Sequence, residues 1–435
     1  MKNYRKWIPI VLALLVLGSW YKMYSDRAST KGEYESYLAE ARKHAANGVT
    51  KFAIANYTAA LEIIPSEEIY GEVAEYYLSQ NDAAGYVTWV EDFHEKYPTS
   101  SLAYDYLVRG YMNDEMYDDV YDVLDEAEKR GVSSEYMRSV KEEIYYMYSM
   151  GFAAYEDVGI FSSNLCAVMS DGKWGFVNRY GELRISCKYS EVGVYTSRDV
   201  VPVINSQGKP YFIDKTGSKV IASNETFLRF GNFAGDLIPA QKADGKYVYL
   251  DGEMNTLFGG FEYAGTMNGG IAAVQDKGQW RLINSQGEFI TEQGYEDIKL
   301  DGKQICYRND RIFAKIGEKY AMLDGSGRQI GTRTFEDAMP FLDSTYAAVK
   351  IDSKWTFIDK DGNLYGDKYE EARSYANGFA AVRIAGKWGY INLEGKVVIE
   401  PSFYGAIDFN EKGSCFVKTG EEWQLLKIYR LNRGG

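Results

Sequence analysis

The chain has 435 residues, of which 46% are hydrophobic and 26% charged, and its formal net charge is −13. A hydrophobic share of this size supports buried cores and excludes a disordered chain. The negative charge argues against nucleic-acid binding, which needs a basic surface. The two histidines leave little room for histidine-based catalysis or a zinc site.

The first segment is typical of membrane targeting, because basic residues precede an apolar run from Trp7 to Tyr21. A free-standing span needs roughly 17–25 residues, and the apolar residues after Lys22 lengthen this run. We therefore expect residues 1–28 to be an uncleaved transmembrane signal anchor. Its basic flank would hold the N-terminus in the cytoplasm and leave the body extracytoplasmic. The alternative is a cleaved signal peptide, which would make the protein secreted.

From about residue 30 to 150, apolar residues recur at steps of three and four, which places each set on one helix face. The four stripes are Ala53, Tyr57, Ala60, Leu61 and Ile64; Tyr86, Val90, Phe93 and Tyr97; Tyr117, Val120, Leu124 and Ala127; and Met137, Val140, Ile144 and Met147. Helix breakers separate the stripes, and Pro65, Pro98 and Gly131 are 33 residues apart. The sequence thus predicts about three helical hairpins in a domain at 29–151.

This period, and the small alanines between Ala53 and Pro65, resemble tetratricopeptide repeats. The resemblance implies a concave surface that holds peptides or partner proteins; a plain helical spacer is the other interpretation. The segment from Lys31 to Glu143 carries 24 acidic and 10 basic residues, against 38 and 39 in the rest of the chain. Such a charge is typical of a solvated face, and its functional alternative is attraction of a basic partner.

The region from about residue 155 to 430 contains an internal repeat. Its anchor is Gly-Lys-Trp-Gly at 172–175 and 386–389, and the aligned anchors are Trp174, Pro210, Tyr247, Trp280, Tyr320, Trp355, Trp388 and Trp423. An apolar pair follows each anchor, then Asn or Asp in seven units, and Gly three residues later in six. Asn or Asp followed at that distance by Gly is typical of the tight turn of a β-hairpin.

Each unit has two further elements. A short strand with small central residues precedes the anchor, and Pro202 and Pro239 interrupt it in two units, which favours a bulge or a position facing away from a neighbour. An aromatic residue, usually followed by an acid and an aliphatic residue, opens each unit. Because one such unit cannot bury both faces, the units must stack. We expect residues 152–435 to form a β-propeller of about eight units, with an open β-solenoid as the alternative.

The pattern Gly-Lys-Trp-Gly-aromatic-Ile-Asn-x-x-Gly, with Ala-Ala-Val upstream, resembles the WG-repeat, or KWG-repeat, family of bacterial proteins. Units two, three, five and eight depart from it, since three lack the Trp and the last lacks both glycines. The resemblance implies a class of repeat and no defined reaction. We expect the repeated anchor aromatics to pack between units, and an excess of tyrosines on the surface to be available for binding.

No motif points to chemistry. His44 and His94 lack partners at metal-ligand spacing, and Asp359–Asn363 resembles a calcium loop only superficially, so we expect a hairpin turn there. Cys166 and Cys415 occupy equivalent positions in units one and eight, so a latch disulfide is an alternative to two buried apolar side chains. We expect no catalytic, cofactor-binding or metal-binding residues, and no cofactor.

The expected protein is therefore a membrane-anchored, extracytoplasmic binding or scaffold protein that acts through protein–protein interaction and is not an enzyme. One alternative is an envelope polysaccharide-binding protein that uses exposed aromatic side chains of the β domain. The other is a carboxylate-dependent hydrolase with its acid pair in a ring channel. Partner proteins, among them basic ones, and the membrane are the expected partners, and nucleic acid is not.

Overall fold

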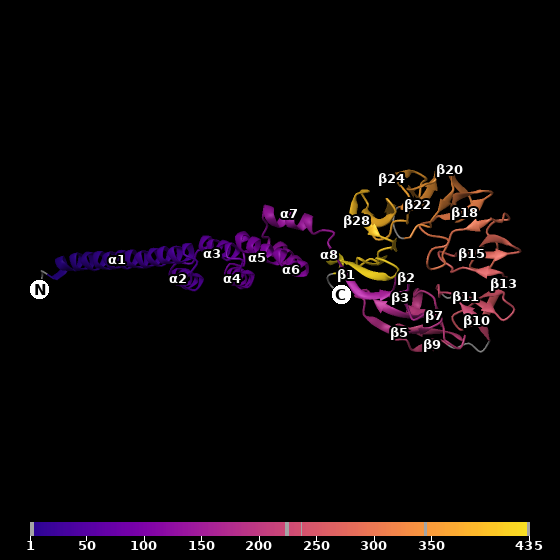
Figure 1. Cartoon of the computed structure of the whole chain (residues 1–435), viewed down its shortest axis with the longest axis horizontal. Coiled ribbons are helices and arrows are strands. Elements are labelled where there is room, and N and C mark those ends of the chain that lie inside the picture. Colours follow the sequence, from indigo (N-terminus) through magenta and orange to yellow (C-terminus); the bar gives the residue numbers. More distant parts are fainter. Residues whose placement is uncertain (1–3, 222–225, 236, 343–345, 433–435) are drawn as a thin grey trace. The chain divides into compact units, whose positions relative to one another are not determined.

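The structure, a computed structural model, describes residues 4–221, 226–235, 237–342 and 346–432; before residue 27 it describes few side chains. The chain divides into two compact units, Met1–Tyr145 and Tyr146–Gly435. The first unit is helical and the second consists of β-sheets (Figure 1).

The helical unit consists of successive antiparallel hairpins, as the sequence predicts. Its helices are α1 (Tyr4–Ala46), α2 (Thr50–Ile63), α3 (Glu67–Ser79), α4 (Ala83–Lys96), α5 (Ser101–Asn113), α6 (Tyr117–Arg130) and α7 (Glu135–Glu143). The helices end at the predicted breakers, and Gly131 ends α6 with a φ of 70°. Side chains of Ser66, Asp82, Ser100 and Ser134 accept the backbone N–H three residues later and so begin four of the helices.

The predicted apolar stripes form the core of this unit. Tyr57, Tyr86, Val90 and Phe93 are buried, whereas Ile64 lies just beyond α2 and is 37% exposed. Polar contacts join alternate helices: Arg42 on α1 donates to both carboxylate oxygens of Glu72 on α3, at 2.8 and 2.7 Å. The hairpins therefore pack through aromatic side chains and are tied to one another by charge-assisted hydrogen bonds.

The expected membrane anchor falls at the start of α1, which continues without a break into the first hairpin. Most side chains of residues 1–28 lie outside the described part of the chain. Among the residues that are described, no helix has the length and apolar character needed to cross a membrane.

The second unit contains eight sheets within its described residues. In blades 1 to 4 the strands are β2 (Asp157–Ser162), β3 (Leu165–Ser170), β4 (Lys173–Asn178) and β5 (Leu183–Tyr189); β6 (Glu191–Val192), β7 (Val200–Ile204), β8 (Pro210–Asp214) and β9 (Lys219–Ile221); β10 (Phe227–Phe230), β11 (Ile238–Lys242), β12 (Tyr247–Leu250) and β13 (Thr256–Phe261); and β14 (Tyr263–Ala264), β15 (Ile271–Asp276) and β16 (Gln279–Asn284). In blades 5 to 7 they are β17 (Asp297–Ile298), β18 (Ile312–Ile316), β19 (Lys319–Leu323) and β20 (Gln329–Phe335); β21 (Asp337–Ala338), β22 (Tyr346–Ile351), β23 (Lys354–Asp359) and β24 (Leu364–Tyr369); and β25 (Glu371–Ala372), β26 (Phe379–Ile384), β27 (Lys387–Asn392) and β28 (Val397–Phe403). Blade 8 contains β29 (Gly405–Ala406), β30 (Ser414–Lys418), β31 (Trp423–Ile428) and β1 (Tyr148–Tyr155), and α8 (Tyr429–Asn432) follows.

The sheets form a closed ring, an eight-bladed β-propeller, and not the open solenoid that was the alternative (Figure 1). The ring closes because β1 pairs antiparallel with β31, so the first strand of the unit is the outermost strand of the last blade. This pairing explains why the last unit has Lys427 where seven others have Asn or Asp. No hairpin turn follows β31, since its outer neighbour comes from the other end of the repeat region. The domain boundary expected after residue 151 lies within β1.

The Trp-Gly pair of the repeat has a steric cause. In blades 1 and 7 the pairing of the fourth strand is irregular beside the residue after the anchor, and a Cβ on Gly175 would lie 2.5 Å from the carbonyl oxygen of Ile185. A Cβ on Gly389 would lie equally close to the carbonyl oxygen of Ile399. The anchor itself pairs across the same ladder with the aromatic residue that opens the next unit, as Trp174 does with Tyr189. The anchor side chains are buried or half-buried, and Trp174 packs against a hydrophobic cluster that contains residues of blades 1 and 2.

The acid near the start of a unit holds the turn before the anchor. Glu156 accepts the backbone N–H of Gly172 at 3.1 Å, and Glu370 accepts that of Gly386 at 2.9 Å. The short strand beside this acid is the innermost strand of its blade, as β2 is in blade 1. The strand with small central residues is the second strand, as β3 is in the same blade. The small residues leave room for the inner part of the blade, as where a Cβ on Gly159 would lie 3.2 Å from Cβ of Ala167.

Pro202 lies in regular pairing with β8, without a bulge. Its carbonyl oxygen accepts the N–H of Gly193 at 2.8 Å, toward the inner strand. Since the nitrogen and carbonyl of one strand residue point to the same side, the proline nitrogen faces away from β8. The proline therefore occupies a position that does not interrupt the β7–β8 ladder, which is one of the two outcomes that the sequence predicts.

Candidate functional site

A turn in blade 5 crosses the centre of the ring. The anchors Trp280 and Tyr320 are 40 residues apart, the longest interval in the repeat, because extra residues lie between β17 and β18. We call Asp301–Gln304 the plug. The buried Asp301 shapes it: one carboxylate oxygen accepts the N–H groups of Lys303 and Ile305, at 2.8 and 2.9 Å. The other accepts a hydrogen bond from Nε of Arg308 at 2.9 Å and forms an ion pair with Nη2 of the same side chain at 2.8 Å.

The plug contacts blades 1 and 3, which are not its neighbours, as well as the adjacent blade 4. Asn232 of blade 3 donates from its amide nitrogen to the carbonyl oxygen of Lys303 at 3.0 Å. The N–H of Thr266 in blade 4 donates to the carbonyl oxygen of Gln304 at 2.8 Å. A Cβ on Gly302 would lie 3.0 Å from Cδ1 of Ile160 in blade 1. Contacts to blades 1, 3 and 4 from one turn of blade 5 place the plug across the axis.

The residue four positions after the aromatic residue that opens each unit divides the ring into two halves. Blades 1 to 4 have glycine there, and blades 5 to 8 have large residues: Gly159, Gly193, Gly231 and Gly265, against Lys299, Met339, Arg373 and Ile407. Gly265 must be small because its Cβ would lie 3.0 Å from the carbonyl oxygen of Gln304. The glycine half therefore makes room for the plug, and the other half surrounds an open space.

That space, the axial cavity, has a volume of about 570 Å³. Its lining comes from the inner strands of blades 1 and 6, from the residues after the inner strands of blades 1 and 5 to 8, from Trp355 in β23, and from the plug: Ile160–Asn164, Lys299–Lys303, Arg308, Asp337–Pro340, Leu342, Trp355, Arg373, Ser374, Ala376, Asn377 and Asp408–Glu411. Apolar side chains such as Phe161, Met339 and Phe409 alternate with amides and charges. A cavity of this size and mixed lining is typical of ligand-binding sites in proteins.

Ion pairs between neighbouring blades set the charge of this cavity. Arg373 of blade 7 donates to both carboxylate oxygens of Asp408 in blade 8, at 2.7 and 2.8 Å. Lys299 of blade 5 lies 2.9 Å from Asp337 of blade 6. The charge of Asp408 raises the pKa of Arg373, and hydrogen bonds to Asp337 and Tyr320 outweigh burial and raise that of Lys299. Both cations are therefore ionised and already paired.

The residues that the sequence analysis considered for catalysis or metal binding do not line this cavity. His44 lies in α1 and His94 in α4, where burial lowers the pKa of His94. Asp359 accepts the N–H groups of Asp361 and Asn363 at 2.9 and 2.8 Å, so its loop is a hairpin turn, as predicted. No cluster of three or more metal-binding side chains occurs among the residues that the structure describes.

The cysteine and tyrosine predictions have different outcomes. All four cysteines are free, and Cys166 and Cys415 are buried, so the latch disulfide is wrong and the apolar interpretation holds. The sequence predicts an excess of tyrosines on the surface, but many tyrosines are buried and donate hydrogen bonds to the backbone. The hydroxyl of Tyr390 donates to the carbonyl oxygen of Ile407 at 2.8 Å, and that of Tyr249 donates to the carbonyl oxygen of Gly265. The exposed aromatic side chains of the propeller, such as Tyr180 and Phe289, are scattered over different blades.

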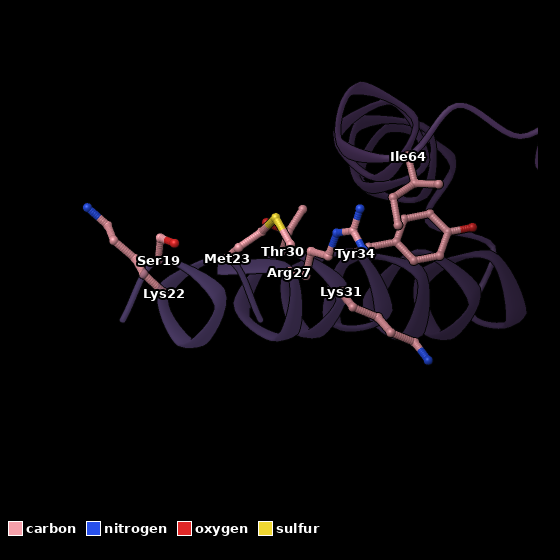
Figure 2. A pocket seen from close by; sticks show the side chains of 8 residues that line it. All are labelled: Ser19, Lys22, Met23, Arg27, Thr30, Lys31, Tyr34 and Ile64. Carbon is pink, nitrogen blue, oxygen red and sulfur yellow. The ribbon is translucent and has the colours of Figure 1, made fainter. Parts of the chain in front are cut away.

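A second hollow lies on the helical unit, along α1 and the end of α2. Figure 2 shows its lining, in which Tyr34 and Ile64 lie side by side near Arg27, while Lys31 points away from α2. It is an open groove on one side of a helix. Its mixed lining does not bring together groups that could perform chemistry.

The plug and the cavity could not be located from the repeat pattern, which shows only what the units share. The interval of 40 residues before Tyr320 was the one signal of the inserted turn. The ion pairs join residues of successive units, such as Arg373 and Asp408, and neither residue stands out in its own unit.

Comparison with known proteins agrees with the repeat pattern. The family described as WG containing repeat matches residues 153–174, 174–209, 355–388 and 388–423. No curated protein matches the sequence. Among solved structures, BamB from Moraxella catarrhalis is similar at 11% identity over 64% of this chain and 98% of that chain, with a TM-score of 0.41. The WD40 β-propeller domain of Doa1 is similar at 11% identity over 65% and 96%, with a TM-score of 0.34. Blades 1, 2 and 6 to 8 thus contain the matched segments, and this chain carries the WG-containing repeat.

Proposed function

We propose that this chain is a scaffold protein that binds other proteins and performs no reaction of its own. The axial cavity of the propeller receives a segment of a partner, and the helical unit offers a second surface. The observation that carries the proposal is the make-up of the cavity, where preformed ion pairs, amides and apolar side chains line a space of about 570 Å³.

The cavity suits a peptide segment better than a simple ion. The cations Lys299, Arg308 and Arg373 each have a carboxylate partner. With Lys303 and Glu411 included, the lining has four basic and four acidic side chains, so it offers no net charge to an ion. A peptide combines apolar side chains with backbone N–H and C=O groups, which the apolar and amide residues of the lining can match. Because the ion pairs fix their side chains before binding, little conformational entropy is lost when the partner enters.

The same pairing argues against a hydrolase. A glycosidase needs one carboxyl group that gives a proton and a second that acts on the sugar or on water. Asp301, Asp337 and Asp408 each form an ion pair with a cation of the lining. Glu411 is the fourth acid, so the part of the lining that the structure describes has no second carboxylate that is not already engaged. The axial cavity has no histidine or cysteine in its described lining.

The location is proposed from the sequence. The basic residues before Trp7–Tyr21 support an N-terminal membrane anchor with the rest of the chain on the extracytoplasmic side. Reading out the cellular location needs a protease-accessibility assay on intact cells. Digestion of the propeller from outside would support the proposal, and protection until the cells are lysed would contradict it.

The helical unit adds a negatively charged surface. Some of its acids are used within the unit, as Glu72 by Arg42 and Glu75 by Arg109 at 2.7 Å, but the segment keeps a large acidic excess. That excess favours a partner with a basic surface, whose association would weaken as salt rises.

The test of the scaffold function uses the full chain and two matched variants. Glu411 is exposed at the axial cavity, and Glu421 is exposed in a turn of the same blade outside it. A photoreactive amino acid at Glu411 is expected to cross-link one protein partner in cells, while the same group at Glu421 gives no such product. Charge reversal, Glu411→Arg, should reduce recovery of that partner at least tenfold, and Glu421→Arg should leave it unchanged. Equal cross-linking at both positions would refute a partner at the cavity.

A further inference from the structure

A second, smaller cavity lies on the other side of the plug, and we infer that it binds one neutral sugar residue. We call it the side cavity. Its volume is about 240 Å³, and it is lined by blades 2, 3 and 4 and by Gly302 and Gln304 of the plug. Gly302 lines the axial cavity as well, so the plug separates the two spaces. This site is independent of the proposed partner site.

Glycines of blades 2 and 3 allow other groups to pack closely against the backbone at the wall of the side cavity. Gly193 and Gly231 follow the inner strands and line it together with Pro202 and Pro239. A Cβ on Gly231 would lie 2.9 Å from Cγ of Pro239, and one on Gly193 would lie 2.5 Å from the side-chain oxygen of Asn232. The space is therefore bounded by flat, rigid groups that cannot collapse into it. A rigid space of this volume fits a single ring of about the size of a hexose.

A buried polar atom at the side cavity lacks a partner. Thr266 lines the cavity and is 1% exposed, and its hydroxyl makes no hydrogen bond to any residue that the structure describes. Leaving a buried hydroxyl unpaired costs free energy, so such a group is a candidate for contact with a ligand. Asn232, by contrast, has a partner at each amide atom: its oxygen accepts the N–H of Val194 at 2.8 Å and its nitrogen donates to the carbonyl oxygen of Lys303.

The remaining polar groups surround the same space. Gln304 and Tyr263 both line the cavity, and the side-chain oxygen of Gln304 accepts a hydrogen bond from the hydroxyl of Tyr263 at 2.6 Å. Arg229 and Glu191 form a half-exposed ion pair of 2.7 Å, and both line the cavity. A hydroxyl, an amide, a guanidinium and a carboxylate are placed around one ring-sized space. Each can bond a hydroxyl group, which both donates and accepts.

The apolar part of the lining favours a sugar over an ion. The rings of Tyr247 and Tyr263 have centroids 5.6 Å apart and belong to the lining together with the two prolines. The C–H faces of a pyranose pack on aromatic and proline rings, while its edge carries hydroxyl groups in several directions. Because Arg229 is already paired with Glu191, an anionic ligand gains little there. The ligand is therefore a neutral pyranose, either a free monosaccharide or the terminal residue of a glycan.

The experiment measures binding of pyranoses to the full chain by saturation-transfer NMR and titration calorimetry. The probes are glucose, galactose, mannose, N-acetylglucosamine and their methyl glycosides. At least one is expected to bind, and Thr266→Val and Arg229→Ala should each weaken it at least tenfold. Binding of the methyl glycoside would identify a glycan end as the source, and binding of the free sugar alone would identify the monosaccharide. If no probe binds at 10 mM, or if both variants bind as wild type does, the inference is wrong.

Stability separates a ligand-binding hydroxyl from a structural one. Thr266→Val removes an unpaired buried hydroxyl and should raise the Tm by about 1–3 °C. Thr356→Val is the matched control, because the Thr356 hydroxyl is buried and donates to the carbonyl oxygen of Tyr365 at 3.1 Å. The control should lower the Tm by a similar amount and leave sugar binding unchanged. A fall in Tm for Thr266→Val would show that its hydroxyl has a structural partner and would overturn the inference. Arg184→Ala, on another exposed ion pair, controls for Arg229→Ala.

Discussion

Replacing the glycine of the Trp-Gly pair by alanine tests the steric account of the repeat. In Gly389→Ala, the added Cβ would lie 2.5 Å from the carbonyl oxygen of Ile399 and 2.7 Å from the nitrogen of Pro401. Ordinary carbon–oxygen contacts begin at about 3.3 Å, so β28 must move by roughly 0.8 Å. The obstructing atoms are backbone atoms of a strand that pairs with β27, and a rotamer change therefore cannot relieve the contact.

Overpacking of this kind costs about 1–3 kcal/mol, of which the lower entropy of the unfolded alanine chain returns roughly 0.4–1 kcal/mol. We expect a net loss near 2 kcal/mol, or a fall in Tm of about 4–8 °C, followed by circular dichroism and tryptophan fluorescence. Gly420→Ala is the control, since nothing lies within 4 Å of its Cβ and its backbone has no positive φ. Its Tm should be unchanged or slightly higher. If Gly389→Ala melts with the wild type, the glycine does not serve the close approach of the fourth strand.

Three further predictions address the polar ties. Arg373→Ala and Asp408→Ala should each destabilise the propeller by about 2–4 kcal/mol, while the double variant should cost little more than either alone; additive losses in denaturant titrations would show that the pair is not coupled. Arg42 hydrogen bonds hold the pKa of Glu72 below its ordinary value, so the stability from this carboxylate is complete above about pH 5 and is lost as the pH falls through the lowered pKa. Glu72→Gln should remove that part of the acid dependence of unfolding, and an unchanged profile would contradict it. Tyr390→Phe should cost about 1–2 kcal/mol in thermal unfolding, because it leaves a buried carbonyl oxygen without its hydroxyl donor; a neutral effect would refute that role.

The sequence predicts the blades because their determinants are local. Asn178 shows this: its side-chain oxygen accepts the N–H groups of Tyr180 and Glu182, both at 3.0 Å, and Gly181 takes a φ of 87°. These bonds lie within five residues, so the spacing in the sequence reveals the turn directly. The helix breakers at Pro65 and Gly131 are local in the same way, and the helical hairpins follow from them.

The parts that the sequence does not reveal depend on distant residues. Ring closure joins β1 to β31, and its one sequence signal is the missing turn residue at Lys427. The tyrosine excess was assigned to the surface because a tyrosine's burial depends on a distant acceptor, such as the carbonyl oxygen of Gly265 for Tyr249. The two cavities exist because glycine and large residues occupy opposite halves of the ring, which becomes visible only when the inner strands are placed around one axis.

Hydrogen exchange at the closing strand pair tests most directly whether the chain forms a closed eight-bladed ring. In the full chain, the paired amides of β1 and β31 should be protected to the same degree as those of the β26–β27 ladder within blade 7. Exchange of the β1 amides within seconds, while β26 and β27 stay protected, would contradict closure of the ring by the N-terminal strand.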